Sequence, residues 1–227
     1  MMSLKLIYFK MRALAEAPQM LMRHHNVAYD YVMSWDHFDD VWANVKPTIA
    51  FRQLPMLEVD GTHQICQSIA IMSYIERYAG IALTDPVQQA QAAAITQSAQ
   101  ELFAPLNPAV NFAVGDDFTA KREAMRDMLV GRFADLVRCL DVYEGRFFFD
   151  DMPRSAEFAA YHHLDLSRHL DPGILSQFPR LEAFVADIEA LPAIAAYLAE
   201  RPALIDVGIA PKLVIEGAPH PTGVHKT

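Results

Sequence analysis

Cysteine is scarce in this sequence. Its 227 residues include only Cys66 and Cys139, and no CxxC pair is present. A disulfide framework and a cysteine-based redox or zinc motif are therefore excluded, and two free thiols are typical of a reducing compartment. Cys66 ends an expected strand next to a candidate ligand loop, where packing explains it better than nucleophilic chemistry.

Basic charge and long apolar runs are also lacking. The formal net charge is −9, whereas a nucleic-acid-binding protein needs a basic face. No apolar run approaches the roughly 18 residues of a membrane helix. Lys5, Lys10, Arg12 and Glu16 interrupt the N-terminal segment, which therefore does not resemble a signal peptide. We expect a cytoplasmic protein with neither a nucleic-acid nor a membrane partner.

The first 80 residues alternate between short apolar runs and helical patterns. Strands are predicted at Leu4–Phe9, Ala28–Met33, Met56–Val59 and His63–Cys66, and helices at Ala13–His25 and Ile69–Ala79. Trp35–Lys46 is a short, acidic, poorly patterned segment that takes the place of the second helix in the order. Asp60-Gly61 between two strand-like runs is a strong hairpin signal, and Ser68 is predicted to be the N-cap of the last helix. The order β-α-β-α-β-β-α is that of the thioredoxin fold. Residues 1–82 are therefore expected to form an α/β thioredoxin-like domain.

The pattern changes after residue 82. Val87–Phe103 and Lys121–Tyr143 have long helical patterns, a further helix ends near Leu191, and Pro192 is expected at the first position of the next helix. No strand signal of comparable quality follows residue 80. Residues 83–227 are therefore predicted to form an all-α helical bundle domain, with Gly208–Thr227 as an extended surface tail or a frayed end.

Tyr8 lies at the end of the first predicted strand. A tyrosine hydroxyl at such a position, beside a helix N-terminus, can donate a hydrogen bond to a thiolate. This raises the reactive fraction of a thiol whose pKa is about 8.5. From spacing alone, a core or surface aromatic is the more frequent role of such a residue.

Three further groups could contact a small peptide that carries carboxylates. A cis Leu54–Pro55 bond would turn the Leu54 N–H and C=O outward for strand-like pairing, although trans is the commoner state. Ser68 and the N–H groups of its helical turn form an anion site, or Ser68 is only a cap. Trp42 and Lys46, one helical turn apart, offer an indole N–H and an ammonium group. The alternative is a half-buried tryptophan and a solvated lysine.

In this order the residues resemble the cytosolic glutathione transferases, most closely the sigma class, which includes the prostaglandin D synthases of animals. The matching segments are Lys5–Glu16, Trp42 with Lys46, Phe51–Gly61, Gln67–Ile71, Phe178–Leu181 and Leu191–Ile194. The likeness covers the first 80 residues well and the helical half more loosely. It implies the glutathione transferase architecture of a thioredoxin-like domain followed by a helical domain.

The resemblance also implies a role for each matching residue. Tyr8 corresponds to the catalytic hydroxyl that hydrogen-bonds the glutathione sulfur. The residues that would hold glutathione are Trp42, Lys46 and Gln53 at the glycine carboxylate, the Leu54 backbone next to Pro55 at the cysteinyl part, and Gln67 and Ser68 at the γ-glutamyl carboxylate. Glu101 is the candidate for an acidic residue that reaches the γ-glutamyl amine of the neighbouring subunit, which requires a homodimer.

Three positions depart from the family pattern. Leu14 stands where sigma enzymes usually have an arginine that helps to polarise the catalytic hydroxyl. Arg52 replaces the usual glycine of the loop after Phe51. Arg154-Ser155 precedes Ala156-Glu157-Phe158, so the usual Ser/Thr helix cap is expected to be shifted or lost.

Apolar residues around these positions could receive a second substrate. The candidates are Phe9, Met11, Leu14, Phe103, Leu106 and Phe112, and core filling is the alternative role for each. His162-His163 is not expected to bind a metal, because adjacent residues of a helix face different ways.

We therefore expect an enzyme of the detoxification type, a glutathione transferase that activates the thiol of glutathione for attack on a small hydrophobic electrophile. Glutathione would be a co-substrate, with no metal cofactor. Conjugation, isomerisation, peroxide reduction and ether cleavage are alternative reactions. A non-catalytic glutathione-binding or structural protein of the same fold is the alternative function.

Overall fold

The computed structural model describes residues 3–222. Its contacts divide this part of the chain into two compact units, which meet in the sequence between Ala82 and Leu83. Each unit has a core of its own.

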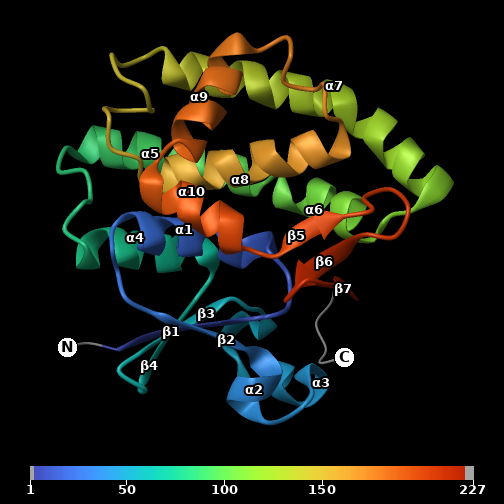
Figure 1. Ribbon diagram of the computed structural model, residues 1–227. Helices are drawn as coiled ribbons and strands as arrows, with labels where there is room; N and C mark the ends of the chain where they lie inside the picture. The colour runs from blue at the N-terminus through green and yellow to red at the C-terminus, as the bar shows by residue number, and fades with distance from the viewer. Residues whose placement is uncertain (1–2, 223–227) are drawn as a thin grey trace. The chain divides into compact units, whose positions relative to one another are not determined.

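The N-terminal unit is built on a four-stranded mixed sheet (Figure 1). Its strands are β1 (Leu4–Tyr8), β2 (Asp30–Met33), β3 (Met56–Val59) and β4 (His63–Cys66), in the order β2-β1-β3-β4. β1 runs parallel to β2 and antiparallel to β3, and β3 forms an antiparallel hairpin with β4. Asp60 and Gly61 both have positive φ in the hairpin turn, a conformation that Gly adopts freely and Asp tolerates.

Helices cover this sheet. α1 (Glu16–His24) and α4 (Ser68–Tyr78) pack against each other on one side, and α2 (Ser34–Phe38) with α3 (Trp42–Val45) lies on the other (Figure 1). The connections contain three short 3₁₀ turns: η1 (Ala13–Ala15), η2 (Lys46–Thr48) and η3 (Ala50–Arg52). The core side chains include Leu6, Ile7, Met20, Met56, Leu57, Ile71 and Met72, all fully buried. Each contributes about 1.5–3 kcal/mol through burial, and together they hold the end of β1 in place.

The C-terminal unit contains six helices within the described residues. They are α5 (Pro86–Gln100), α6 (Phe103–Phe112), α7 (Gly115–Leu140), α8 (Ser155–Leu170), α9 (Pro179–Glu189) and α10 (Pro192–Glu200). α8 packs against α5, α6 and α9, and most of its residues are buried, as expected of a helix at the centre of a core. The predicted fold class, an α/β thioredoxin-like unit followed by a helical bundle, is confirmed.

The N-terminus of α8 has no Ser or Thr cap but keeps an acidic residue that accepts backbone N–H groups. The N-cap is Arg154, and the Glu157 carboxylate accepts the backbone N–H groups of Arg154 at 2.7 Å and Phe148 at 3.0 Å. Burial raises the pKa of Glu157 to about 7, against the opposing effect of these hydrogen bonds. The loss of the Ser/Thr hydroxyl is therefore accompanied by retention of the acidic partner.

Several element boundaries differ from the prediction, and two of them concern candidate site residues. The predicted helix Val87–Phe103 is present as α5 but ends at Gln100, because the chain turns at Glu101 and Leu102 before α6 begins at Phe103. Ser68 is not the N-cap of α4. Gln67, with φ 75°, accepts the first helical hydrogen bond from Ile71, so Ser68 is already the first helical residue.

The C-terminal tail is also different from the prediction. A three-stranded antiparallel sheet consists of β5 (Ala203–Ile205), β6 (Lys212–Ile215) and β7 (Ala218–Pro221). It joins the helical unit through Gly208, which forms a bridge with Val114 and accepts the Gly115 N–H at 3.0 Å. The prediction of an extended or frayed tail was therefore wrong up to Pro221, and residues 223–227 lie outside the described residues.

Candidate functional site

The Tyr8 hydroxyl lies at the end of β1 and is held by the following loop. The residue is 3% exposed, and its hydroxyl oxygen accepts a hydrogen bond from the Leu14 backbone N–H at 3.3 Å. Burial raises the pKa of Tyr8 well above its usual value, with the Leu14 hydrogen bond acting in the opposite direction. Tyr8 is therefore protonated at neutral pH, and its O–H can act as a donor.

The loop between β1 and α1 brings Trp42 to the same part of the unit. The Phe9 ring packs at 5.3 Å from the Tyr8 ring and at 5.1 Å, edge to face, from the Trp42 ring. Trp42 begins α3, and its carbonyl accepts the N–H of Lys46, which places these two residues one helical turn apart. Trp42 is half-buried and Lys46 is exposed.

A second group forms where β3 and α4 begin. The side-chain amide of Gln67 donates a hydrogen bond to the Gln53 side-chain oxygen at 3.2 Å. The Leu54–Pro55 peptide bond, which lies between Gln53 and β3, is cis. This is the state that strand-like pairing by the Leu54 backbone requires. Ser68 is buried at the first position of α4, where the N–H groups of the first turn have no helical partner. These N–H groups and the helix dipole favour an anion.

Comparison with known proteins identifies the family. The model of the glutathione S-transferase N-terminal domain matches residues 4–77, and that of the C-terminal domain matches residues 106–201. Hematopoietic prostaglandin D synthase of Gallus gallus is 34% identical over 205 residues, which covers 87% of this chain and 96% of that protein. The chain belongs to the glutathione S-transferase family.

Other relatives agree with this assignment. Glutathione S-transferase P of Caenorhabditis elegans is 27% identical over 208 residues, covering 89% of this chain and 95% of that protein. The crystal structure of the glutathione S-transferase from Ascaris lumbricoides superposes with a TM-score of 0.75 at 27% identity, covering 88% and 98% of the two chains. The predicted family and the prediction of a glutathione transferase enzyme are confirmed.

Glu101, the residue expected to act in a neighbouring subunit of such a transferase, is bound within its own chain. It follows the end of α5, is about half exposed, and forms an ion pair with Arg132 of α7 at 2.8 Å. Arg132 also donates to the Ser98 hydroxyl at 3.1 Å. The carboxylate is thus accessible and held in one place, and its role across an interface stays a prediction.

The candidate residues for the second substrate differ in exposure. Phe9 and Met11 are buried, and Leu14 is half-buried, in the N-terminal unit. In the helical unit, Leu106 has no exposed surface and fills the core. The candidates of that unit with accessible surface are half-buried Phe103 and Phe112, which is 48% exposed at the end of α6.

The histidine pair of α8 is structural. The Nδ1 atom of His163 lies 2.8 Å from the Ala159 carbonyl, and burial lowers the pKa of His163 to about 3, with a further contribution from His162. Within residues 3–222, no three His, Cys, Asp or Glu side chains are grouped as metal ligands. None of the helices in this same range is both long and apolar enough to cross a membrane.

Two features of the site were not found from the sequence. The donor to the Tyr8 hydroxyl is the backbone N–H of Leu14, and a backbone donor cannot be inferred from the residue type. Tyr31 of β2 donates a hydrogen bond to the Phe9 carbonyl at 3.2 Å. Its position opposite Leu6 in the neighbouring parallel strand was the available signal, because such residues share a face of the sheet.

Proposed function

We propose that the chain binds glutathione in its N-terminal unit and that Tyr8 stabilises the glutathione thiolate. The observation that carries this proposal is the hydrogen bond from the Leu14 N–H to the Tyr8 hydroxyl oxygen. This bond occupies an acceptor site on the oxygen and makes the O–H a stronger donor. A sulfur atom facing the hydroxyl would receive a preorganised hydrogen bond that favours its anionic form.

The carboxylates of glutathione would be bound at the two other groups. Ser68 and the first-turn N–H groups of α4 suit the γ-glutamyl carboxylate, and Gln67, braced by Gln53, lies beside them. The Trp42 indole and the Lys46 ammonium suit the glycine carboxylate. The Leu54 backbone would pair with the cysteinyl part.

The chemistry would be transfer of the thiolate to a small hydrophobic electrophile. The sulfur forms a bond to an electrophilic carbon, whose leaving group departs with its electron pair or whose displaced electrons take a proton from water. In the N-terminal unit, half-buried Leu14 provides apolar surface for this substrate, in keeping with the apolar character of small-molecule sites.

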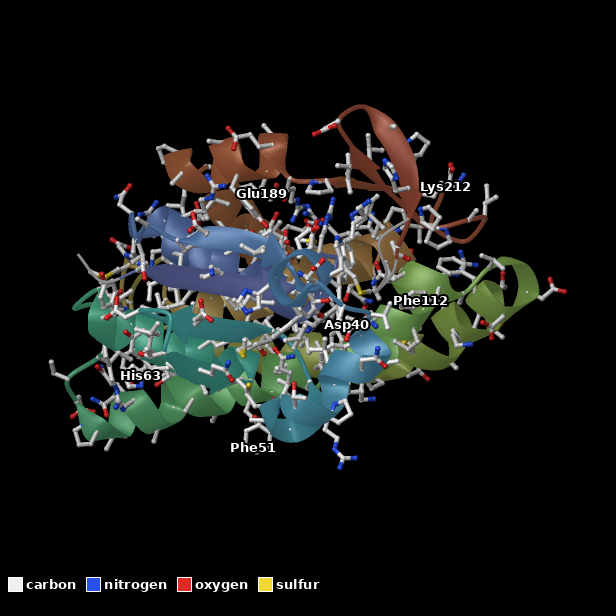
Figure 2. The ribbon with its side chains drawn as sticks, turned by 90° about the horizontal axis from the view of Figure 1, so that it is seen from below. Asp40, Phe51, His63, Phe112, Glu189 and Lys212 are labelled. Carbon is white, nitrogen blue, oxygen red and sulfur yellow. The ribbon has the colours of Figure 1, made fainter. Side chains whose placement is uncertain are left out.

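We further propose a cytoplasmic homodimer. Phe51 is 71% exposed, and its side chain extends outward from its loop (Figure 2). A cavity of about 170 Å³ in the helical unit lies between α5 and the end of α7, lined by apolar side chains that include Ile95, Val142 and Phe149. A twofold dimer could bury an exposed aromatic ring and an apolar cavity of each chain, because every contact of such an interface occurs twice. Glu101 would then be available to a site of the second subunit.

Thermal melts with and without glutathione test binding. A ligand that binds only the folded state stabilises it by about 2.7 kcal/mol at a hundredfold excess over Kd. We expect a higher Tm with millimolar glutathione and a smaller shift for Ser68→Ala. The absence of a shift at saturating ligand would overturn the proposal. Retention on immobilised glutathione without turnover of a panel of electrophiles would favour the non-catalytic alternative.

A further inference from the structure

Tyr31 of β2 contacts the loop between β1 and α1, which also contains the Leu14 N–H that donates to Tyr8. Its register partner is Leu6, and Tyr8 pairs with Met33, so Tyr31 and Tyr8 project on the same face of the sheet. The Tyr31 hydroxyl extends beyond the end of β1 and donates to the Phe9 carbonyl at 3.2 Å. The same carbonyl accepts the Met11 N–H at 2.8 Å.

These hydrogen bonds fix both ends of one loop. Phe9, at the start, is held by Tyr31, and Leu14, at the end, donates to Tyr8 at 3.3 Å. Between them Ala13 has φ 31°, outside the conformations that a residue with a Cβ prefers. A strained residue of this kind keeps its geometry only where its surroundings hold it, so loss of one anchor is expected to move the Leu14 N–H.

We propose that Tyr31 is a positioning residue for thiol activation: by fixing the Phe9 carbonyl it aligns the Leu14 N–H with the Tyr8 hydroxyl. The inference rests on the proposed role of Tyr8. Tyr31 acts through the loop and does not contact the substrate.

The surroundings of Tyr31 keep it protonated for this role. Burial raises the pKa of Tyr31 well above its usual value, and the neighbouring Tyr8, Glu16 and Tyr29 add to the effect. Its O–H proton is therefore present over the whole pH range in which the thiol of glutathione titrates, and Tyr31 does not itself introduce a pH dependence there.

Tyr31→Phe tests the inference, because it removes the hydroxyl and keeps the ring. The matched control is Tyr29→Phe. The Tyr29 hydroxyl donates to Gln19 of α1 at 3.3 Å and accepts from Arg23 at 3.4 Å, and neither contact involves the loop. The readouts are the thiol pKa of bound glutathione, from thiolate absorbance against pH, and the Kd for glutathione.

In Tyr31→Phe we expect the thiol pKa to rise by about 0.5 unit, a roughly threefold smaller thiolate fraction below the pKa, with Kd changed less than about twofold. In Tyr29→Phe the thiol pKa should equal that of the wild type. In a Tyr8→Phe background, Tyr31→Phe should produce no further rise. An unchanged thiol pKa in Tyr31→Phe overturns the inference. Equal rises of the thiol pKa in Tyr31→Phe and Tyr29→Phe also overturn it.

The Tyr8→Phe variant separates the two claims. If it raises the thiol pKa while Tyr31→Phe does not, only the positioning role fails. If Tyr8→Phe leaves the thiol pKa at the wild-type value, the proposed role of Tyr8 fails together with this inference.

Discussion

The backbone N–H of Leu14 donates a hydrogen bond to the hydroxyl oxygen of Tyr8 over 3.3 Å. Because the donor belongs to the main chain, it does not depend on the side chain at position 14. The resemblance to sigma enzymes predicts an arginine where this sequence has leucine, and the structure has a backbone donor to the same hydroxyl. Tyr8 therefore has a hydrogen-bond partner although residue 14 is not an arginine.

Ser68→Ala is predicted to weaken glutathione binding more than it weakens the fold. Ser68 is the first helical residue and not the cap, so its loss should lower the free energy of unfolding by less than about 1 kcal/mol. A charge-assisted hydrogen bond to a carboxylate corresponds to about 10- to 100-fold in Kd. Calorimetry measures both quantities, and exposed Ser73→Ala on the same helix is the control. Wild-type affinity in Ser68→Ala would remove Ser68 from the site.

Arg52 has φ 55° at a position where the family resemblance predicts glycine. A side chain in this left-handed conformation costs about 1–2 kcal/mol, partly offset because glycine makes the unfolded chain more flexible. Arg52→Gly is therefore predicted to be about 1 kcal/mol more stable than Arg52→Ala in denaturant unfolding. Both variants remove the same side chain, so equal stabilities would show that the backbone at position 52 is not strained.

Sequence patterns predicted the N-terminal unit better than the rest. The strands Met56–Val59 and His63–Cys66 have the predicted bounds, because Asp60-Gly61 fixes the hairpin between them. The C-terminal sheet was missed because its strands are short and Gly and Pro surround them. Pro219 and Pro221 lie in β7 at the edge of that sheet, where a missing N–H is tolerated.

The candidate site was predictable only in part. Tyr8, Trp42 and Gln67 have residue types that suggest their chemistry in combination. The hydrogen bond between Gln67 and Gln53, and the one from Leu14 to Tyr8, depend on how the backbone turns at Gln67 and Ala13, both of which have positive φ. Neither position carries a glycine or asparagine that would signal such a turn.

His163 is predicted to make the fold sensitive to acid. Its pKa is about 3 in the folded state, below the unfolded value of 6.5, so the folded state binds fewer protons and its stability falls as pH falls below about 6.5. Between pH 6.5 and 4.5 the loss should be about 2–3 kcal/mol relative to His163→Gln, in which this group does not titrate. Denaturant unfolding at several pH values measures the slope, with exposed His63→Gln as control. Parallel pH profiles for wild type and His163→Gln would contradict the prediction.

Phe51→Ser is predicted to weaken the homodimer. The ring is 71% exposed in a single chain, so its removal should leave the stability of the monomer nearly unchanged while apolar area is lost from the proposed interface. Light scattering over a dilution series should give twice the mass of one chain for the wild type and a lower mass for the variant. Ile209→Ser, which changes another exposed apolar residue outside α5 and α7, is the control. A wild-type protein with the mass of a single chain would remove the shared site and the role of Glu101.

The central claim is that Tyr8 stabilises the thiolate of bound glutathione, and the thiol pKa in Tyr8→Phe tests it most directly. The account predicts a rise toward the free-thiol value of about 8.5 and a fall in kcat/KM of roughly 10- to 1000-fold, with glutathione affinity within a few fold. Leu14→Ala is the matched control, because it keeps the backbone N–H and should leave the thiol pKa unchanged. A thiol pKa and a turnover in Tyr8→Phe equal to those of the wild type would contradict the account.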